Sequence, residues 1–157
     1  MRAATLVASL ATLVIVPASA EPSAAPTTAD VVAGAQACAV KSMSEAKMLA
    51  RLFELGWMKT ASRNVPGLGN LTLFSRNGVQ LSYFHAKEMK QCVVKVAAQP
   101  SIAIDGLVAE LSTLFDKQPK IEEAGKRYLY FLPRLDILTL QVKDSPAGST
   151  IELSVVH

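Results

Sequence analysis

His85 and Cys92 are the two residues of this sequence whose types could provide nucleophilic chemistry. A thiol needs a nearby base to become the reactive thiolate, and an imidazole can act as that base. The sequence shows no third residue that would orient the imidazole, and a cysteine in an exported chain favours oxidation. We therefore interpret His85 as a polar residue at the end of a hairpin. A small hydrolase that uses His85 with Cys92 or a carboxylate is kept as an alternative.

The sequence gives only weak indications of a metal site or of a catalytic acid–base pair. Cys38, His85, Cys92 and His157 lack the close spacing with which zinc ligands share one turn, so neither a metal site nor a cofactor is predicted. Several carboxylates could in principle form an acid–base pair, but they stand where helix surfaces and caps would place them. These carboxylates are Asp105, Glu110, Asp116, Glu122 and Glu123.

The first twenty residues have the pattern of a secretory signal peptide. Met1-Arg2 gives a basic start, an apolar run covers 3–16, and Ala18-Ser19-Ala20 supplies a small-x-small ending. The apolar run is shorter than the roughly 20 residues that a membrane-spanning helix needs. We therefore predict a signal peptide at 1–20 and an exported mature protein, periplasmic or extracellular, without a membrane span.

The remaining 137 residues have the length of one domain. The 16 lysines and arginines include Arg2, so 15 remain against 13 acidic residues, which is too even to indicate nucleic acid or an anionic membrane as partner. The segment 21–30 has two prolines and no large apolar side chain, and is predicted to be a flexible leader. A single α+β domain is expected over 31–157.

Cys38 and Cys92 are the two cysteines of the chain. An even number of cysteines in a protein sent to an oxidising compartment favours a disulfide. Two buried thiols are the alternative. A bond between them would tie the N-terminal helix to a strand of the sheet.

Hydrophobic periodicity predicts short helices and strands along the whole domain. A short helix is expected over 31–40, although Gly34 disfavours it. A longer helix is expected to begin at Ser42, which forms a capping-box pair with Glu45, and to end at Gly56. Another is expected between Pro100 and Pro119. Asn77-Gly78 is a strong hairpin signal between two of the strands. Strands are predicted at 57–61, 71–75, 79–84, 92–97, 127–132, 135–143 and 150–156.

Short links between these elements can join only antiparallel neighbours. We therefore predict an α+β fold in which an antiparallel sheet of about six strands carries two main helices on one face. The pattern Leu-x-x-Leu-Phe-acid begins at both Leu49 and Leu111, which is compatible with a duplicated helix-plus-meander unit. The alternative is that any helix packed on a sheet tends to show this pattern.

The segment 126–134 places basic residues on both sides of a strand that is apolar on both faces. If helices cover one face of the sheet, either Tyr128 and Tyr130 or Leu129 and Phe131 stay exposed, and exposed aromatics beside arginine are typical of binding surfaces. The alternative is a central strand whose second face is covered by the N-terminal segment or by a partner subunit. The residues assigned to binding are Tyr128, Tyr130, Arg127 and Arg134.

These observations favour an exported, non-enzymatic binding protein that acts through a sheet face, such as an inhibitor, an immunity-like factor or an envelope accessory factor. Its expected partner is another envelope or extracellular protein, not nucleic acid, and a homodimer is an alternative. A carrier of a lipid or another apolar ligand is a further alternative, which would need an interior cavity between helices and sheet.

Overall fold

The computed structural model describes residues 24–39, 45–67, 69–86, 89–133 and 136–156. The predictions for the signal peptide at 1–20, for residues 21–23 of the leader, and for Ser42, Arg134 and His157 therefore lie outside the described residues. Within the described part of the chain, no helix is long and apolar enough to cross a membrane.

The described residues form three α-helices and one antiparallel sheet of eight strands. The helices are α1 Thr28–Cys38, α2 Glu45–Glu54 and α3 Ile104–Phe115, and a single 3-10 turn, η1, covers Glu123–Gly125. The strands are β1 Met58–Val65, β2 Gly69–Arg76, β3 Val79–His85, β4 Lys90–Ala97, β5 Lys120–Glu122, β6 Arg127–Phe131, β7 Ile137–Ser145 and β8 Gly148–Val156.

The predicted α+β class and the antiparallel sheet are confirmed, but six strands were too few. The strand order is β1-β2-β3-β4-β8-β7-β6-β5, so the two halves of the chain meet where β4 pairs with β8. β5 was missed because it has three residues and a single apolar side chain, Ile121. β1 was predicted only in part because nearly all its residues are exposed, so it has no alternation of apolar and polar residues.

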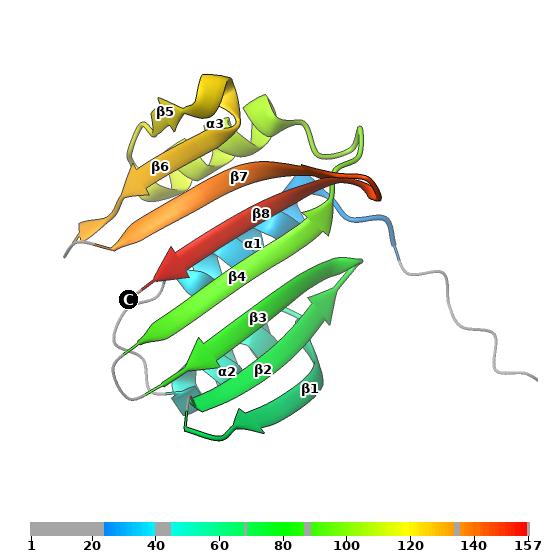
Figure 1. Ribbon diagram of the computed structural model, residues 1–157, viewed down its shortest axis with the longest axis vertical. Helices are drawn as coiled ribbons and strands as arrows, with labels where there is room; N and C mark the ends of the chain where they lie inside the picture. The colour runs from blue at the N-terminus through cyan, green and yellow to red at the C-terminus, as the bar shows by residue number, and fades with distance from the viewer. Residues whose placement is uncertain (1–23, 40–44, 68, 87–88, 134–135, 157) are drawn as a thin grey trace, which may run out of the picture.

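The three helices lie behind the sheet in the view of Figure 1, and the front face of the sheet carries none of them. α1 lies centrally, in contact with β3, β4 and β8 and with both other helices. Buried side chains of the strands point to the helix side, where they form one core with Trp57 and Leu52. The front face of the sheet, which we call the open face, is therefore half exposed.

The two halves of the chain share an element order but not a packing pattern. α2 is followed by the meander β1–β4, and α3 is followed by the meander β5–β8. In the repeated Leu-x-x-Leu-Phe pattern, however, Leu52 is buried whereas its counterpart Leu114 is exposed, and Phe53 is exposed whereas Phe115 is half-buried. The two copies of the pattern thus turn different residues toward the sheet.

Gly34 explains how α1 can lie so close to the sheet. A Cβ atom at this position would come within 2.8 Å of Val94 on β4 and within 3.1 Å of the Trp57 ring. The same approach brings Cys38 at the end of α1 onto Cys92 of β4, with 5.4 Å between the Cα atoms, and the two form the predicted disulfide. The glycine that disfavours a helix in isolation is therefore required by the packing.

We expect the substitution Gly34→Ala to lower the free energy of unfolding by about 2 kcal/mol, because the added methyl group overpacks the contact with Val94. Gly106→Ala is the matched control, since it adds the same methyl group to α3 where nothing lies within 4 Å. The control should stabilise the protein by about 0.5 kcal/mol through helix propensity. Urea unfolding of both variants measures the difference, and equal effects at the two positions would contradict the packing role of Gly34.

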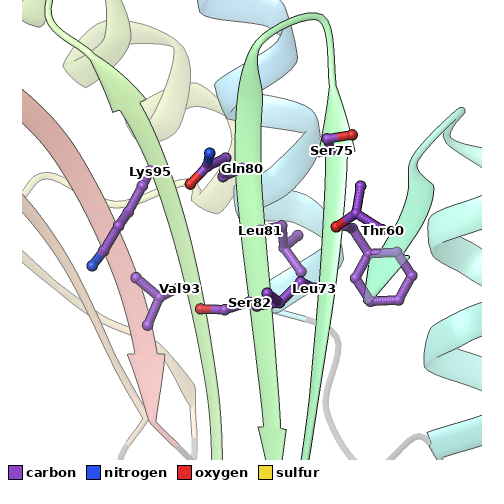
Figure 2. Close-up of a pocket in the computed structure, with 9 residues that line it drawn as sticks. Thr60, Leu73, Ser75, Gln80, Leu81, Ser82, Val93 and Lys95 are labelled. Atoms are coloured by element: carbon purple, nitrogen blue, oxygen red, sulfur yellow. The ribbon is translucent and has the colours of Figure 1, made fainter. Parts of the chain in front are cut away.

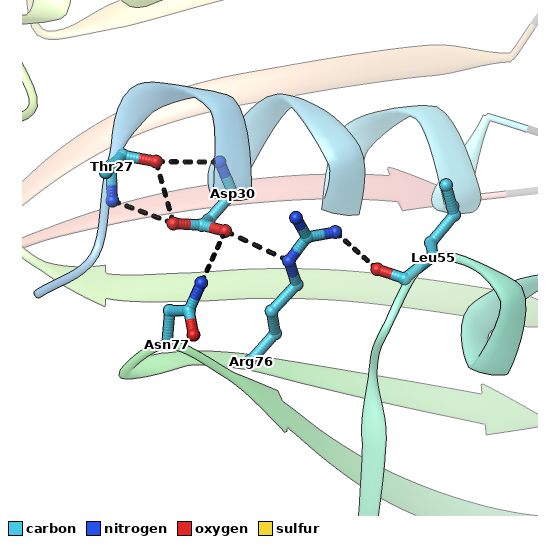
Figure 3. Close-up of polar contacts among 5 residues, drawn as sticks. All are labelled: Thr27, Asp30, Leu55, Arg76 and Asn77. Atoms are coloured by element: carbon cyan, nitrogen blue, oxygen red, sulfur yellow. Dashed lines mark hydrogen bonds and ion pairs between the residues drawn. The ribbon is translucent and has the colours of Figure 1, made fainter. Parts of the chain in front are cut away.

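The start of α1 is fixed by a buried carboxylate, shown in Figure 3. Thr27 and Asp30 form a capping box, and the Thr27 hydroxyl donates to an Asp30 carboxylate oxygen at 2.7 Å. The other oxygen accepts from the Asn77 side chain at 3.1 Å and lies 3.0 Å from the Arg76 Nε atom. Arg76 also donates to the backbone carbonyl of Leu55, just after α2.

This carboxylate shortens the predicted leader. Residues 28–30 belong to α1 and Asp30 is buried, so the flexible segment predicted for 21–30 cannot extend that far. The preceding backbone is also held, because the Pro26 carbonyl accepts hydrogen bonds from Gln99 at 3.1 Å and from Ser101 at 3.1 Å. Polar contacts rather than apolar burial order this segment, which is why its composition suggested flexibility.

Candidate binding surface on the open face of the sheet

Strand register places the side chains of the open face in rows that cross the sheet. The row near the C-terminal end of β8 is apolar, and we call it the apolar row. In it Phe131 stands opposite Ile137, and Ile137 stands opposite Val156. Beyond Gln91 of β4, the row continues through Phe84 and Leu71.

Three large apolar residues of the apolar row are exposed to solvent. The exposed fractions are 53% for Phe131, 46% for Val156 and 40% for Ile137. These three residues stand on the adjacent strands β6, β7 and β8, so they form one continuous patch. Contiguous apolar side chains on a surface, in contrast to scattered ones, are typical of interaction sites.

A shallow hollow lies beside the apolar row, over β2, β3 and β4 (Figure 2). Its volume is about 290 Å³, and Leu73 and Val93 contribute apolar side chains to its lining. Ser82 lies between them, and Lys95 extends from β4 toward β8 at one side. The hollow is large enough for one apolar side chain of a partner and is bordered by hydroxyl and amine groups.

Charged residues form the opposite end of the open face, in two groups. Glu152 lies between two lysines, 2.7 Å from the Lys143 Nζ atom and 3.2 Å from the Lys95 Nζ atom. Glu122 lies 2.8 Å from Lys120 and 3.9 Å from Arg127. The first group has two cations and one carboxylate and therefore a net positive charge. In the second, Arg127 also lies 3.6 Å from Glu123 of η1, so its two cations are balanced by two carboxylates.

Both carboxylates stay ionised well below neutral pH. Burial alone would raise the pKa of Glu152, but hydrogen bonds from Lys143 and Lys95, together with their charges, lower that pKa below its ordinary value. The pKa of Glu122 is lowered mainly by its hydrogen bond from Lys120. Acidification toward pH 5 therefore leaves the charge pattern of the open face unchanged.

The structure decides which face of β6 is exposed. Tyr128 and Tyr130 point to the helix side and are buried, with exposed fractions of 8% and 0%. The Tyr130 hydroxyl donates to the Val108 carbonyl of α3 at 3.1 Å, and burial raises the pKa of this tyrosine. The alternate residues Leu129 and Phe131 are the ones that lie on the open face.

The structure describes one of the two arginines that were predicted to bind. Arg127 lies on the open face, 3.9 Å from Glu122 and 3.6 Å from Glu123, and its Nε atom is buried without a hydrogen-bond partner among the described residues. Its guanidinium group is therefore partly engaged within the protein. Arg134 lies outside the described residues.

Cys92 cannot be the nucleophile that was considered in the sequence. Cys92 is bonded to Cys38, and a disulfide sulfur has no thiolate to act as nucleophile. His85 stacks on Tyr83, with 6.2 Å between the ring centres, at the end of β3. In the ranges that the structure describes, no three His, Cys, Asp or Glu residues come together as metal ligands.

A second hollow, of about 780 Å³, lies between α3 and the strands β5 and β6 on the helix side of the sheet. Tyr128 contributes to its lining, together with Ile121 and with Asp105 and Asp116 of α3. Of the described residues predicted to bind, Tyr128 is the one that lines this hollow. Its two aspartates give the hollow a charge opposite to that of the open face.

No protein-family model, curated protein or solved structure matches this chain. The function is therefore inferred from the open face itself.

Sequence reasoning missed most of the apolar row. Phe131 was considered, but Ile137, Val156 and Leu71 were assigned to strands without being linked to one surface. One signal was present in the sequence. Val156 lies in alternation with the polar residues Glu152 and Ser154, which indicates an apolar side chain on the solvent-exposed face of β8. The row itself could not be read from the sequence, because it depends on the register of six strands.

Proposed function

We propose that the protein is an exported, non-enzymatic binding protein whose open sheet face recognises an acidic, partly apolar surface of another envelope or extracellular protein. The observation that carries this proposal is the apolar row, in which Phe131, Ile137 and Val156 are exposed side by side. Burying such a patch against a partner removes apolar area from water, which favours association. A disulfide that ties α1 to β4 is compatible with export to an oxidising compartment.

The charge of the open face supports an acidic partner. Among the described strand residues, register and ion pairs place five cations and two carboxylates on this face. The cations are Arg63, Lys95, Lys120, Arg127 and Lys143, and the carboxylates are Glu122 and Glu152. Glu123 of η1 adds a third carboxylate beside Arg127, which leaves an excess of two cations. An excess of positive charge attracts an acidic surface and opposes the packing of a second copy through the same face.

A double variant, Phe131→Ser with Ile137→Ser, should abolish capture of the partner while leaving the fold intact. Proteins from an envelope extract that bind the wild type but not this variant are identified by mass spectrometry and then purified. The measured Kd of the purified partner should rise about tenfold or more, because exposed aromatic anchors dominate interface energetics. Added salt should weaken binding by the wild type.

Phe53→Ser provides the matched control. Phe53 has the same exposed fraction as Phe131, 53%, but stands on α2, on the opposite side of the sheet. Its substitution should leave the Kd unchanged. Equal affinity of the double variant and the wild type would refute the proposal. So would a stable dimer that only the double variant disrupts, or binding to anionic vesicles with no protein partner.

A further inference from the structure

Among the described strands, β1 forms one edge of the sheet, and none of them pairs with its outer side. In the strand order of the described residues, β1 has β2 as its single neighbour. β1 has eight residues, of which all but Val65 are exposed, and it lies at the lower edge of the sheet in Figure 1. An edge strand of this length presents unpaired backbone groups to which an extended segment can add.

The β2–β3 hairpin determines which backbone groups of β1 point outward. Asn77 and Gly78 both have positive φ, 46° and 76°, and form a two-residue turn in which the flanking pair Arg76 and Val79 is hydrogen-bonded. Alternation along β2 then directs the backbone groups of Leu73 and Leu71 toward β1.

The β1 partners of these two residues are Ala61 and Arg63, so these face inward toward β2. The residues between and after them, Ser62 and Asn64, must direct their N–H and C=O groups away from the sheet. A register irregularity between Lys59 and Ala61 interrupts the edge before this point. The usable edge is therefore the regular segment 61–65.

The charge around this edge has one sign. The sequence has no Asp or Glu from Leu55 to Lys87, a stretch that includes β1, β2 and β3. Lys59 and Arg63 of β1 are both exposed, and neither has an ion-pair partner among the described residues. They project to opposite faces of the strand, because their neighbours on β2, Phe74 and Leu71, do so.

We propose that β1 is a docking edge for an extended acidic segment of another protein, which adds to the sheet as a further antiparallel or parallel strand. Ser62 and Asn64 provide the backbone hydrogen bonds, and Arg63 provides charge complementarity within the segment 61–65. Lys59 adds a second positive charge just before the register irregularity. A second copy of this chain is a poor occupant, because its own β1 would bring two more cations to the same edge. This site is separate from the apolar row and does not depend on it.

The probe is a capped peptide of the sequence Thr-Glu-Val-Glu-Val-Glu-Thr, used at concentrations up to the millimolar range. Amide hydrogen exchange measured by NMR should show new protection at Ser62 and Asn64, whereas Ala61 and Arg63, already paired with β2, should change little. The peptide with lysine in place of glutamate should give no protection. Arg63→Glu should weaken binding of the acidic peptide about fivefold.

Ser62→Pro and Ser62→Ala form the decisive pair of variants. Both remove the hydroxyl group that lies 3.3 Å from the Thr72 hydroxyl, but only proline removes the outward N–H group. The acidic peptide should no longer protect the amide of Asn64 in Ser62→Pro, and should still protect it in Ser62→Ala. Unchanged amide exchange in β4 would show that both variants are folded. The variant Phe131→Ser should bind the peptide normally, which separates this edge from the apolar row.

Three outcomes would overturn the proposal. The acidic peptide could leave Ser62 and Asn64 unprotected at millimolar concentration, or it could bind Ser62→Pro as tightly as Ser62→Ala. Sedimentation could also show a dimer of the peptide-free protein that Ser62→Pro abolishes, which would identify a second copy as the occupant.

Discussion

Reduction of the Cys38–Cys92 disulfide is expected to lower the free energy of unfolding by about 4 kcal/mol. The bond joins residues 54 positions apart, and in the chain-entropy model the loop it closes restricts the unfolded chain by about this amount. Both cysteines are buried, so reduction leaves the packing of α1 on β4 nearly unchanged. Because domains of this size are stable by about 5 to 15 kcal/mol, the loss is a large share of the total.

Urea unfolding with and without reductant measures this loss directly. The double variant Cys38→Ala with Cys92→Ala serves as a control, since reductant should not alter its stability. The variant should be less stable than the reduced wild type by a further amount, because it also removes two buried sulfur atoms. Stabilities of oxidised and reduced wild type that agree within about 1 kcal/mol would contradict the bracing role of the bond.

Substitution Asp30→Ala is expected to cost about 3 kcal/mol. The carboxylate caps α1 and accepts hydrogen bonds from Thr27 and Asn77, and its removal leaves Arg76 without its ion-pair partner. One side chain thus holds together the start of α1, the β2–β3 hairpin and, through Arg76, the end of α2 (Figure 3). Asp105→Asn is the matched control, because it changes an exposed first-turn aspartate of α3, and it should cost less than about 1 kcal/mol.

The same carboxylate should make the stability of the protein sensitive to acid. Burial alone would raise the pKa of Asp30, but hydrogen bonds from Thr27 and Asn77 and the charge of Arg76 together lower it below its ordinary value of 3.8. A lowered pKa in the folded state means that the stabilisation is present above pH 4 and is lost as the pH falls through the folded-state pKa. Between pH 5 and pH 2, wild type should therefore lose more stability than Asp30→Asn, and parallel losses would contradict this linkage.

The elements with strong local signals could be predicted from the sequence. Asn77-Gly78 predicted the β2–β3 hairpin, because few residues other than Asn and Gly adopt positive φ at both turn positions. The capping box at Thr27 was missed, since Asp30 occupies the position where glutamate or glutamine is the usual signal. Gly34 was interpreted as a weakness of α1 because its contact with Val94 arises only once the sheet has formed.

The location of the apolar row could not be predicted because it depends on register. The strand from Arg127 to Phe131 is apolar on both faces, so alternation alone does not show which face meets the helices. Leu138 and Leu140 of β7 alternate with polar residues and point into the core, and their pairing with Tyr130 and Tyr128 assigns the tyrosines to the same side. That pairing is a long-range property, set by packing rather than by local sequence.

The position of β8 in the sheet has a consequence for biosynthesis. β8 comes last among the described elements, yet it lies in the middle of the sheet between β4 and β7. Until residues 148–156 emerge from the ribosome, β4 and β7 each retain an unpaired edge, and the two meanders have no strand to join them. We therefore expect the sheet of the nascent chain to stay open until residues 148–156 are available, and to close when β8 pairs with β4 and β7.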